Sequence, residues 1–186
     1  MQGFFQRKGL HYDKTYAPVA FATSLRVALK MGVELDYAMH VVDLKAAYLT
    51  ADIEPHITMF LDPPPGIEVK PGYGLRLIRA LYGSMQGAQR LDVLKHSVLE
   101  RVGFKRMLSE TSVYFSPTRS KIGLALIVTN VDDFCIVARD AAMPEIKRRL
   151  RTVWKIVDQG PVKWLLNLRI HRDRPAGLLK ISQLRI

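Results

Sequence analysis

Three aspartates stand at the ends of otherwise apolar stretches, where carboxylates are costly unless something compensates their charge. Asp43 follows His-Val-Val, and Asp132 and Asp133 follow Leu-Ile-Val-Thr-Asn-Val. An ionised carboxylate at the edge of a buried strand loses hydration, and a divalent cation would offset that loss. Mg²⁺ prefers oxygen ligands and usually takes one or two protein carboxylates together with substrate phosphates. Two such ions would serve phosphoryl transfer, by activating an attacking hydroxyl and stabilising the leaving oxygen.

The spacing of these acids limits which of them can share an ion. Two strand ends side by side in one sheet would bring Asp43 and Asp132 together, whereas adjacent strand residues point to opposite faces. We therefore expect Asp132 to be the primary ligand and Asp133 to support it. The alternative is purely structural: Asp132 and Asp133 would form a hairpin turn, and Asp43 would cap the turn that follows it.

The charge of the chain points to a polyanionic partner. Its 186 residues include 28 Lys and Arg against 17 Asp and Glu, which gives a net charge of +11 and a pI near 10.0. A folded domain with this excess attracts polyanions, of which nucleic acid is the commonest. The densest basic segment is 143–156, and its candidate phosphate-binding residues are Lys147, Arg148, Arg149 and Arg151. The alternatives are a solvated helix face, simple solubility, or an acidic partner.

Composition excludes several classes of protein. A hydrophobic fraction of 48% and a charged fraction of 24% are typical of a globular chain, not of a disordered or collagen-like one. The length predicts one domain, or one domain with a partial second. The single cysteine, Cys135, excludes an internal disulfide framework and a cysteine-based metal site. We expect no membrane contact and an intracellular location, in the cytoplasm or alternatively in the nucleus.

The elements that must position these residues follow from hydrophobic periodicity. Apolar residues at helical spacing predict three helices, over 25–35, 86–102 and 143–156. Apolar runs predict five strands, over 38–44, 57–61, 112–116, 123–131 and 134–138. The last two strands would be joined by a turn at Asp132 and Asp133, and 162–172 with 177–182 would form a closing β-ribbon. This order predicts an α+β sandwich rather than a doubly wound parallel sheet.

Eight short motifs follow one another along the chain: HYDKTYAPVA (11–20), TSLR (23–26), VVDLKAAYLTADI (41–53), PPPG (63–66), ALYGSMQGA (80–88), NVDDF (130–134), LNLRI (166–170) and ISQ (181–183). In this order they resemble the reverse transcriptase of copia-type retrotransposons. That family's pattern reads D-Y-x-x-T-F-A-P-V, D-V-K-T-A-F-L-N-G-x-L, Q-P-P-G-F, S-L-Y-G-L-K-Q-A-P-R-A-W, Y-V-D-D, L-G-I-E-I and L-S-Q. Several motifs in register are far more specific than any single one.

The resemblance implies an α+β polymerase palm with an antiparallel sheet and packing helices, plus part of the fingers. Residues 1–186 would form a single partial reverse transcriptase domain. Its predicted parts are a fingers remnant over 1–37 and 51–85, a palm over 38–50 and 86–160, and a primer-side ribbon over 161–186.

The resemblance also implies roles for single residues. Asp43, Asp132 and Asp133 would be the catalytic residues and would bind two Mg²⁺ ions, with Mn²⁺ as a substitute. Tyr48 would lie beneath the incoming sugar and screen for a 2′-hydroxyl, and Gln86 would touch the incoming nucleotide from the start of a helix. By their local patterns alone, Tyr48 is a core aromatic residue and Gln86 is a solvated residue of a first helical turn.

The implied function is the RNA-directed DNA polymerase domain of a copia-type retrotransposon polyprotein. Its partners would be an RNA or DNA template-primer, deoxynucleoside triphosphates, and the integrase and RNase H of the same polyprotein. Two departures stand out: Asn130 replaces the Tyr of Y-V-D-D, and Asn167 replaces the Gly of L-G-I-E-I. They favour the alternative of a catalytically decayed remnant that still binds nucleic acid. A metal-dependent nuclease using the same acids is a third hypothesis.

Overall fold

The computed structural model describes residues 3–183 as two compact units. The first unit contains residues 3–17 and 46–95, and the second contains residues 18–45 and 96–183. Residues 18–37 thus belong to the unit that holds strand 38–44, whereas the sequence grouped them with 51–85. The last boundary falls inside helix α2 (Gly87–Arg101), which begins in the first unit and ends in the second. Among the described residues, no helix is long and apolar enough to cross a membrane.

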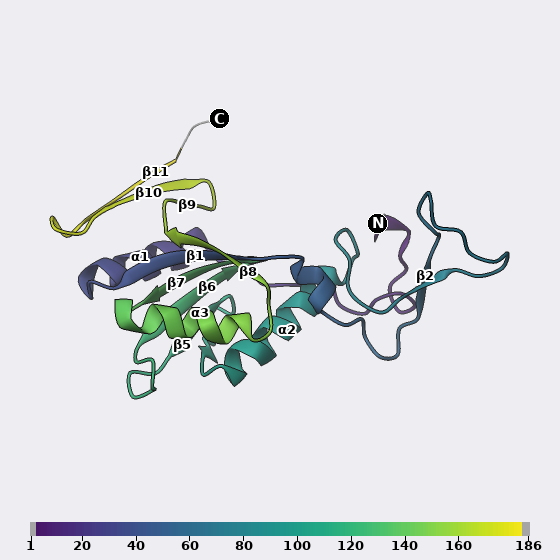
Figure 1. The fold of residues 1–186 in the computed structure, drawn as a ribbon, viewed down its shortest axis with the longest axis horizontal. Helices are drawn as coiled ribbons and strands as arrows, with labels where there is room; N and C mark the ends of the chain where they lie inside the picture. The colour runs from purple at the N-terminus through teal and green to yellow at the C-terminus, as the bar shows by residue number, and fades with distance from the viewer. Residues whose placement is uncertain (1–2, 184–186) are drawn as a thin grey trace. The chain divides into compact units, whose positions relative to one another are not determined.

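The second unit is built on a six-stranded antiparallel sheet (Figure 1). Its strands, in spatial order, are β4 (Lys105–Arg106), β5 (Val113–Ser116), β6 (Ala125–Asn130), β7 (Asp133–Ala138), β1 (Ala38–Leu44) and β8 (Ile156–Pro161). The sequences of β6 and β7 are continuous apolar runs because both faces of these strands are covered. β1 pairs with β7 without a register shift, from Ala38 opposite Ala138 to Asp43 opposite Asp133.

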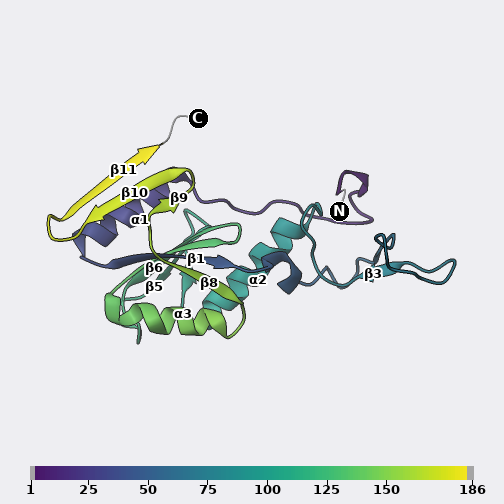
Figure 2. The ribbon, with the colours of Figure 1, turned by 45° about the horizontal axis from the view of Figure 1, so that its top comes forward.

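Different elements cover the two faces of this sheet (Figure 2). One face carries α1 (Ala22–Glu34) and a three-stranded ribbon of β9 (Trp164–Leu165), β10 (Leu168–Asp173) and β11 (Leu178–Gln183). The buried cluster on this face includes Leu25 of α1, Val41 of β1 and Ile170 of β10. The opposite face carries α3 (Met143–Arg151), and the Trp154 ring that follows it meets Phe134 edge-on at 5.7 Å.

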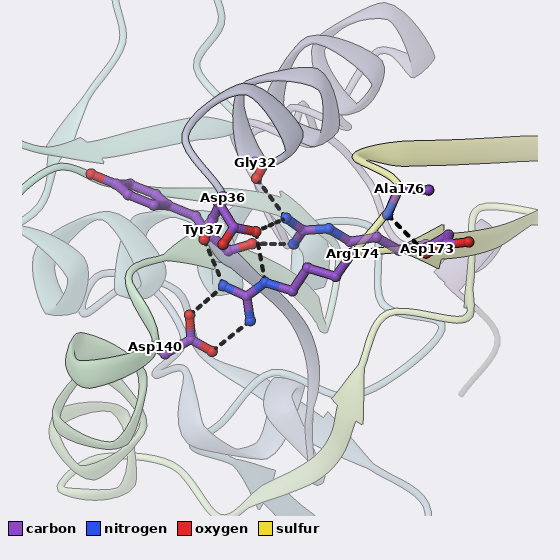
Figure 3. A network of polar contacts seen from close by, with 8 residues as sticks. Gly32, Asp36, Tyr37, Asp140, Asp173, Arg174 and Ala176 are labelled. Atoms are coloured by element: carbon purple, nitrogen blue, oxygen red, sulfur yellow. Dashed lines mark hydrogen bonds and ion pairs between the residues drawn. The ribbon is translucent and has the colours of Figure 1, made fainter.

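Two arginines of the ribbon form ion pairs with Asp36, in the turn between α1 and β1, and with Asp140 (Figure 3). Arg174 binds both carboxylate oxygens of Asp140 in η3 (Asp140–Ala142), at 2.9 and 2.6 Å, and its Nε donates to Asp36 at 2.7 Å. Arg172 donates to the same Asp36 carboxylate at 2.9 Å and to the carbonyl of Gly32 at 3.1 Å. Charge-assisted bonds from a planar guanidinium restrict orientation, so they fix how the ribbon lies against the turn between α1 and β1.

The first unit has much less regular structure. It contains η1 (Gly3–Phe5), η2 (Ala47–Thr50) and a two-stranded sheet of β2 (Met59–Leu61) and β3 (Leu75–Leu77). One apolar cluster of this unit contains Ile53, Ile57 and Met59, with Leu77 packed against them. This cluster buries little apolar surface, so its hydrophobic contribution to stability is correspondingly small.

The sequence-based elements agree with the structure except at a few boundaries and for the short strands β3 and β4, which the apolar patterns did not predict. Strand 38–44 is confirmed, whereas the strand predicted over 57–61 is limited to β2. The helix predicted over 143–156 ends at Arg151, because Trp154 is buried against the sheet and residues 156–161 pair with the free edge of β1 as β8. The β6–β7 turn consists of Val131 and Asp132, one residue earlier than expected. The antiparallel, mixed α/β class of the fold is as predicted.

Candidate active site

Asp43 and Asp133 lie directly opposite each other in the pairing of β1 with β7. The N–H of Leu44 donates to the carbonyl of Asp132 at 2.9 Å, which makes the Asp43–Asp133 pair a non-hydrogen-bonded one. In such a pair the Cα atoms are about 4.5 Å apart and both side chains stand on the same face. Strand alternation puts these side chains on the face of Val41 and Cys135, which is the face that carries α1.

The turn between β6 and β7 supplies the third acid. Asn130 pairs with Asp133, so Asn130, Asp133 and Asp43 form a row across three strands. Val131 has a φ of +49°, as the first central residue of a mirror-image hairpin turn requires. A β-branched residue in this left-handed region is strained, and strain of this kind clusters at functional sites. The expectation paired Asp43 with Asp132, but the register places Asp133 opposite Asp43 and leaves Asp132 in the turn.

These carboxylates repel one another. Burial raises the pKa of Asp133, and the negative charges of Asp132 and Asp43 raise it further. The Nζ of Lys45 is 3.9 Å from Asp43 Oδ2. Because the Lys45 side chain is 56% exposed, this pair is largely screened by solvent. Lys45 therefore offsets little of the repulsion among these carboxylates, and a bound cation would offset more of it.

The carboxylates of this site suit a cation that takes its remaining ligands from the substrate. Among residues 3–183, no group of three His, Cys, Asp or Glu side chains is placed to hold an ion by itself. Mg²⁺ does not need such a cage, because it keeps several waters and takes one or two protein carboxylates plus phosphates. The opposed carboxylates of Asp43 and Asp133 meet that requirement.

The two nucleotide-binding candidates, Tyr48 and Gln86, both lie in the first unit. Tyr48 is a half-buried residue of η2, and its ring meets that of Tyr82 edge-on at 5.5 Å. Gln86 directly precedes α2, and its carbonyl accepts the N–H of Arg90 at 2.9 Å. The predicted helix start is therefore correct. The Gln86 side chain, however, is completely buried, which corrects the expectation of a solvated residue.

The amide of Gln86 is paired at both ends inside the first unit. Its Oε1 accepts from Nε2 of Gln6 at 2.9 Å, and its Nε2 donates to the carbonyl of His11 at 3.0 Å. Gln86 would have to exchange these partners to reach a nucleotide, so that contact stays a prediction. Sequence reasoning missed Gln6, because a partner 80 residues away leaves no local pattern.

Lys147 of α3 is part of a buried ion pair. It is 5% exposed, and its Nζ donates to both carboxylate oxygens of Asp158 at 2.6 and 2.7 Å and contacts Nδ1 of His40 at 2.6 Å. Burial lowers the pKa of His40, and the Lys147 charge lowers it further, so the imidazole is neutral at pH 7. With all its donors used inside the fold, Lys147 is unavailable to a phosphate, and we correct that expectation.

The three arginines of α3 differ in their availability. Arg149 donates to Glu145 at 2.8 Å and to the carbonyl of Val102 at 2.9 Å. Its guanidinium therefore also stabilises the fold through internal hydrogen bonds. Arg148 is exposed and shares Glu145 through its Nε at 2.6 Å. Arg151 is exposed as well, and its closest acid, Asp158, is 3.9 Å away. Arg148 and Arg151 are therefore the α3 residues whose guanidinium groups reach solvent.

The sequence matches the family described as reverse transcriptase (RNA-dependent DNA polymerase) over residues 1–185. It is 30% identical over 186 residues to the retrovirus-related Pol polyprotein from transposon TNT 1-94 of Nicotiana tabacum, which covers 98% of this chain and 14% of that polyprotein. It is 29% identical over 180 residues to the polyprotein from transposon RE1 of Arabidopsis thaliana, with 95% of this chain and 12% of that one covered. The chain thus spans about one seventh or less of the length of these relatives.

Proposed function

This chain belongs to the reverse transcriptase family, whose related sequences lie within retrotransposon Pol polyproteins, and we propose that it catalyses template-directed DNA synthesis by two-metal phosphoryl transfer. The primer 3′-hydroxyl would attack the α-phosphate of a deoxynucleoside triphosphate and release pyrophosphate. The single observation that supports this most is the direct opposition of Asp43 and Asp133 on one face of the sheet.

The acids of the two strands would hold the metal. Asp43 and Asp133, with Asp132 from the turn, are the residues that would bind two Mg²⁺ ions, and Mn²⁺ suits the same oxygen ligands. When bound, these ions supply Lewis-acid stabilisation of the charge that develops during phosphoryl transfer. The protein's own part is to fix the carboxylates in strands β1 and β7, so that little reorganisation is needed when substrate arrives.

We assign the six-stranded sheet of the second unit to the palm and the first unit to the fingers. Tyr48 would contact the incoming sugar, and Gln86 would contact the nucleotide after exchanging its internal partners. Arg148 and Arg151 would contact the backbone of an RNA or DNA template-primer. Integrase and RNase H parts of a polyprotein, and a cytoplasmic or nuclear site of action, belong to the same proposal.

Primer extension on RNA and DNA templates tests this function. We expect the chain to extend a primer with Mg²⁺, and we expect Asp43→Asn and Asp133→Asn each to lower the rate at least about 100-fold, because each removes a metal ligand. Asp52→Asn is the matched control, since its side chain is 77% exposed and lies in the first unit. Extension by Asp43→Asn at the rate of the unsubstituted chain would contradict the proposal.

A second candidate is a remnant that binds nucleic acid without turnover. Asn130 in the row beside Asp133, and the complete internal pairing of Gln86, favour it. The same experiment separates the two functions. A remnant would bind the template-primer in a salt-dependent manner but would not extend it with either Mg²⁺ or Mn²⁺.

A further inference from the structure

A groove of the second unit runs beside helix α1 and is lined by residues that the proposed active site does not use. Its hollow has a volume of about 440 Å³. One wall is α1, where Ser24, Val27 and Met31 lie three and four residues apart and so share one side of the helix. Seven residues of helix span about 10 Å. The groove is therefore about two helical turns long.

The floor of the groove is a part of the sheet that α1 leaves uncovered. α1 packs mainly over β1, β6 and β7, whereas the floor is formed by Val113 and Phe115 of β5 and by Leu126 near the start of β6. Phe115 lies opposite Leu126 in the β5–β6 pairing, so the two side chains stand on one face. Phe115 is only half-buried. A second helix beside α1 would complete this layer, because packed helices lie about 8–10 Å apart.

A carboxylate lies at the end of the groove where α1 begins. Glu110 accepts a hydrogen bond from Oγ of Ser24 at 2.9 Å, and it is the sole charged residue among the described residues that line the hollow. Burial raises its pKa, but hydrogen bonds from Ser112, Ser24 and the N–H of Phe21 outweigh burial and lower the pKa. The group is therefore ionised at neutral pH. These partners are neutral, and no Lys, Arg or His of residues 3–183 forms an ion pair with Glu110.

Exposed apolar side chains continue the groove beyond its hollow. Leu108 is fully exposed and directly follows Met107, which lines the hollow. Phe21, whose N–H binds Glu110, is 69% exposed. A small molecule that filled the hollow would leave Leu108 and Phe21 in water. An apolar surface that extends past its pocket favours a protein partner, and the flexible side chains of Met31 and Met107 suit such a surface.

The charge of the groove is opposite to that of the whole chain. The net charge of +11 attracts acidic molecules in general. A groove that is apolar along its length and ends in an ionised Glu110 instead complements a helix whose apolar stripe ends in Lys or Arg. A cation is most favourable in the last turn of a helix, because of the helix dipole. The partner helix would therefore lie antiparallel to α1, with its C-terminal turn at Glu110.

We propose that the groove formed by α1, β5 and residues 107–110 binds an amphipathic helix of a partner protein, with its apolar side chains in the hollow and a Lys or Arg paired with Glu110. This interaction surface goes beyond the proposed polymerase function. Leu126, in the groove, is four residues from Asn130, which lies beside Asp133, and four strand residues span about 13 Å. The groove is therefore at the opposite end of β6 from the acids.

Fluorescence anisotropy of labelled helical peptides, measured with the full chain, tests this surface. The first peptide carries a stripe of Leu, Gln on its polar face and a single Lys in its last turn, and a hydrocarbon crosslink keeps it helical, since short helices are marginal in water. In the second peptide Glu replaces the Lys. We expect the Lys peptide to bind at least about 5-fold more tightly, although the net charge of the chain favours the Glu peptide. No binding of the Lys peptide, or equal binding of both, would overturn the proposal.

Val27→Gln tests the apolar wall of the groove. Because Val27 is 56% exposed, this variant should leave the unfolding midpoint nearly unchanged and weaken the Lys peptide at least about 5-fold. The matched control is Leu178→Gln, which changes an equally exposed apolar residue of β11 in the same unit. If both variants weaken the peptide equally, the binding is not at the groove and the proposal is wrong.

Glu110→Gln tests the ion pair and keeps an oxygen acceptor for Ser24. It should weaken the Lys peptide by about 3- to 5-fold. A third peptide, with Gln in place of the Lys, should bind the variant and the unsubstituted chain equally, because only the charge pair couples the two changes. Equal weakening of the Lys and Gln peptides would show that Glu110 acts through the shape of the groove, and it would refute the pairing.

Two other occupants of the groove give different results. If the chain dimerises in sedimentation equilibrium and Val27→Gln abolishes the dimer, a second copy covers the groove and the proposal fails. If n-octylamine binds as tightly as the Lys peptide and displaces it, the groove is a site for a small amine and the proposal fails as well. None of these measurements involves primer extension, so the binding surface and the polymerase activity stand or fall separately.

Discussion

Asp133 is held in the native state next to two other carboxylates, and unfolding separates them. Its raised pKa, caused by burial and by the charges of Asp132 and Asp43, means that the native state binds this proton more tightly than the unfolded chain does. The stability contributed by the protonated group is therefore present at low pH and is lost as pH rises through the native pKa. At neutral pH the ionised Asp133 carboxylate therefore lowers the stability of the fold, and a bound cation would offset this.

We predict that Asp133→Asn raises the free energy of unfolding at pH 7 in EDTA by about 0.5–1 kcal/mol, because it removes like charges that face each other across two strands. The gain should disappear near pH 3, where the carboxyl is protonated in both states. Added Mg²⁺ should stabilise the unsubstituted chain but not the variant, by linkage to binding. Urea unfolding measures all three effects. A variant that is less stable than the unsubstituted chain in EDTA at pH 7 would show that Asp133 has a structural partner instead.

At the scale of elements, the pair of Lys147 and Asp158 ties helix α3 to edge strand β8. Burial alone would raise the pKa of Asp158, but the hydrogen bonds from Lys147 and from the N–H of Gly160 outweigh it and lower the pKa. The stability that this lowered pKa reflects is present at neutral pH and is lost as pH falls through the native pKa of Asp158. The Lys147–Asp158 ion pair therefore stabilises the packing of α3 against the sheet, and it leaves neither side chain available to a ligand.

Lys147→Met should destabilise the fold by about 1–3 kcal/mol, since it leaves a partly buried carboxylate without its cation. This cost is smaller than that of breaking a fully buried pair, because the Asp158 side chain is 34% exposed. Arg148→Met on the same helix should leave the unfolding midpoint nearly unchanged, because the Arg148 side chain is 67% exposed. Denaturant unfolding of the two variants compares them directly. Equal destabilisation would mean that the cost lies in the helix itself and not in the ion pair.

At the scale of the whole molecule, the two units differ in how much apolar core they possess. The second unit has a six-stranded sheet whose central strands β6, β7 and β1 are largely buried, whereas the first has a two-stranded sheet and a small apolar cluster of Ile53, Ile57 and Met59. A two-stranded sheet is only marginally stable without further packing. Local opening should therefore be easier in the first unit than in the second.

Hydrogen exchange should resolve this difference. We predict that the amides of β6 and β7 exchange only with global unfolding, while those of β2 and β3 exchange faster by at least about 100-fold, which corresponds to about 2.7 kcal/mol of opening free energy. Mass spectrometry of peptic fragments, collected over minutes to hours, separates the two regions. Equal protection of β2 and β7 would indicate that the two units open together.

The sequence by itself determined the local features of this protein. Apolar periodicity located α1 and β1, the composition established the net charge of +11, and the order of the motifs identified the family. These inferences succeed because each depends on neighbouring residues or on a pattern that survives without knowledge of spatial partners.

Tertiary structure decided which side chains meet. A turn that begins one residue earlier than expected places Asp133 opposite Asp43, because a shift of one residue moves a strand's side chains to the other face. Lys147 and Gln86 looked available from their types and spacing. Both are bound inside the fold, and their partners are distant in sequence: His40 for Lys147, and Gln6 for Gln86. Register and long-range pairing depend on how the whole chain packs, which no local pattern records.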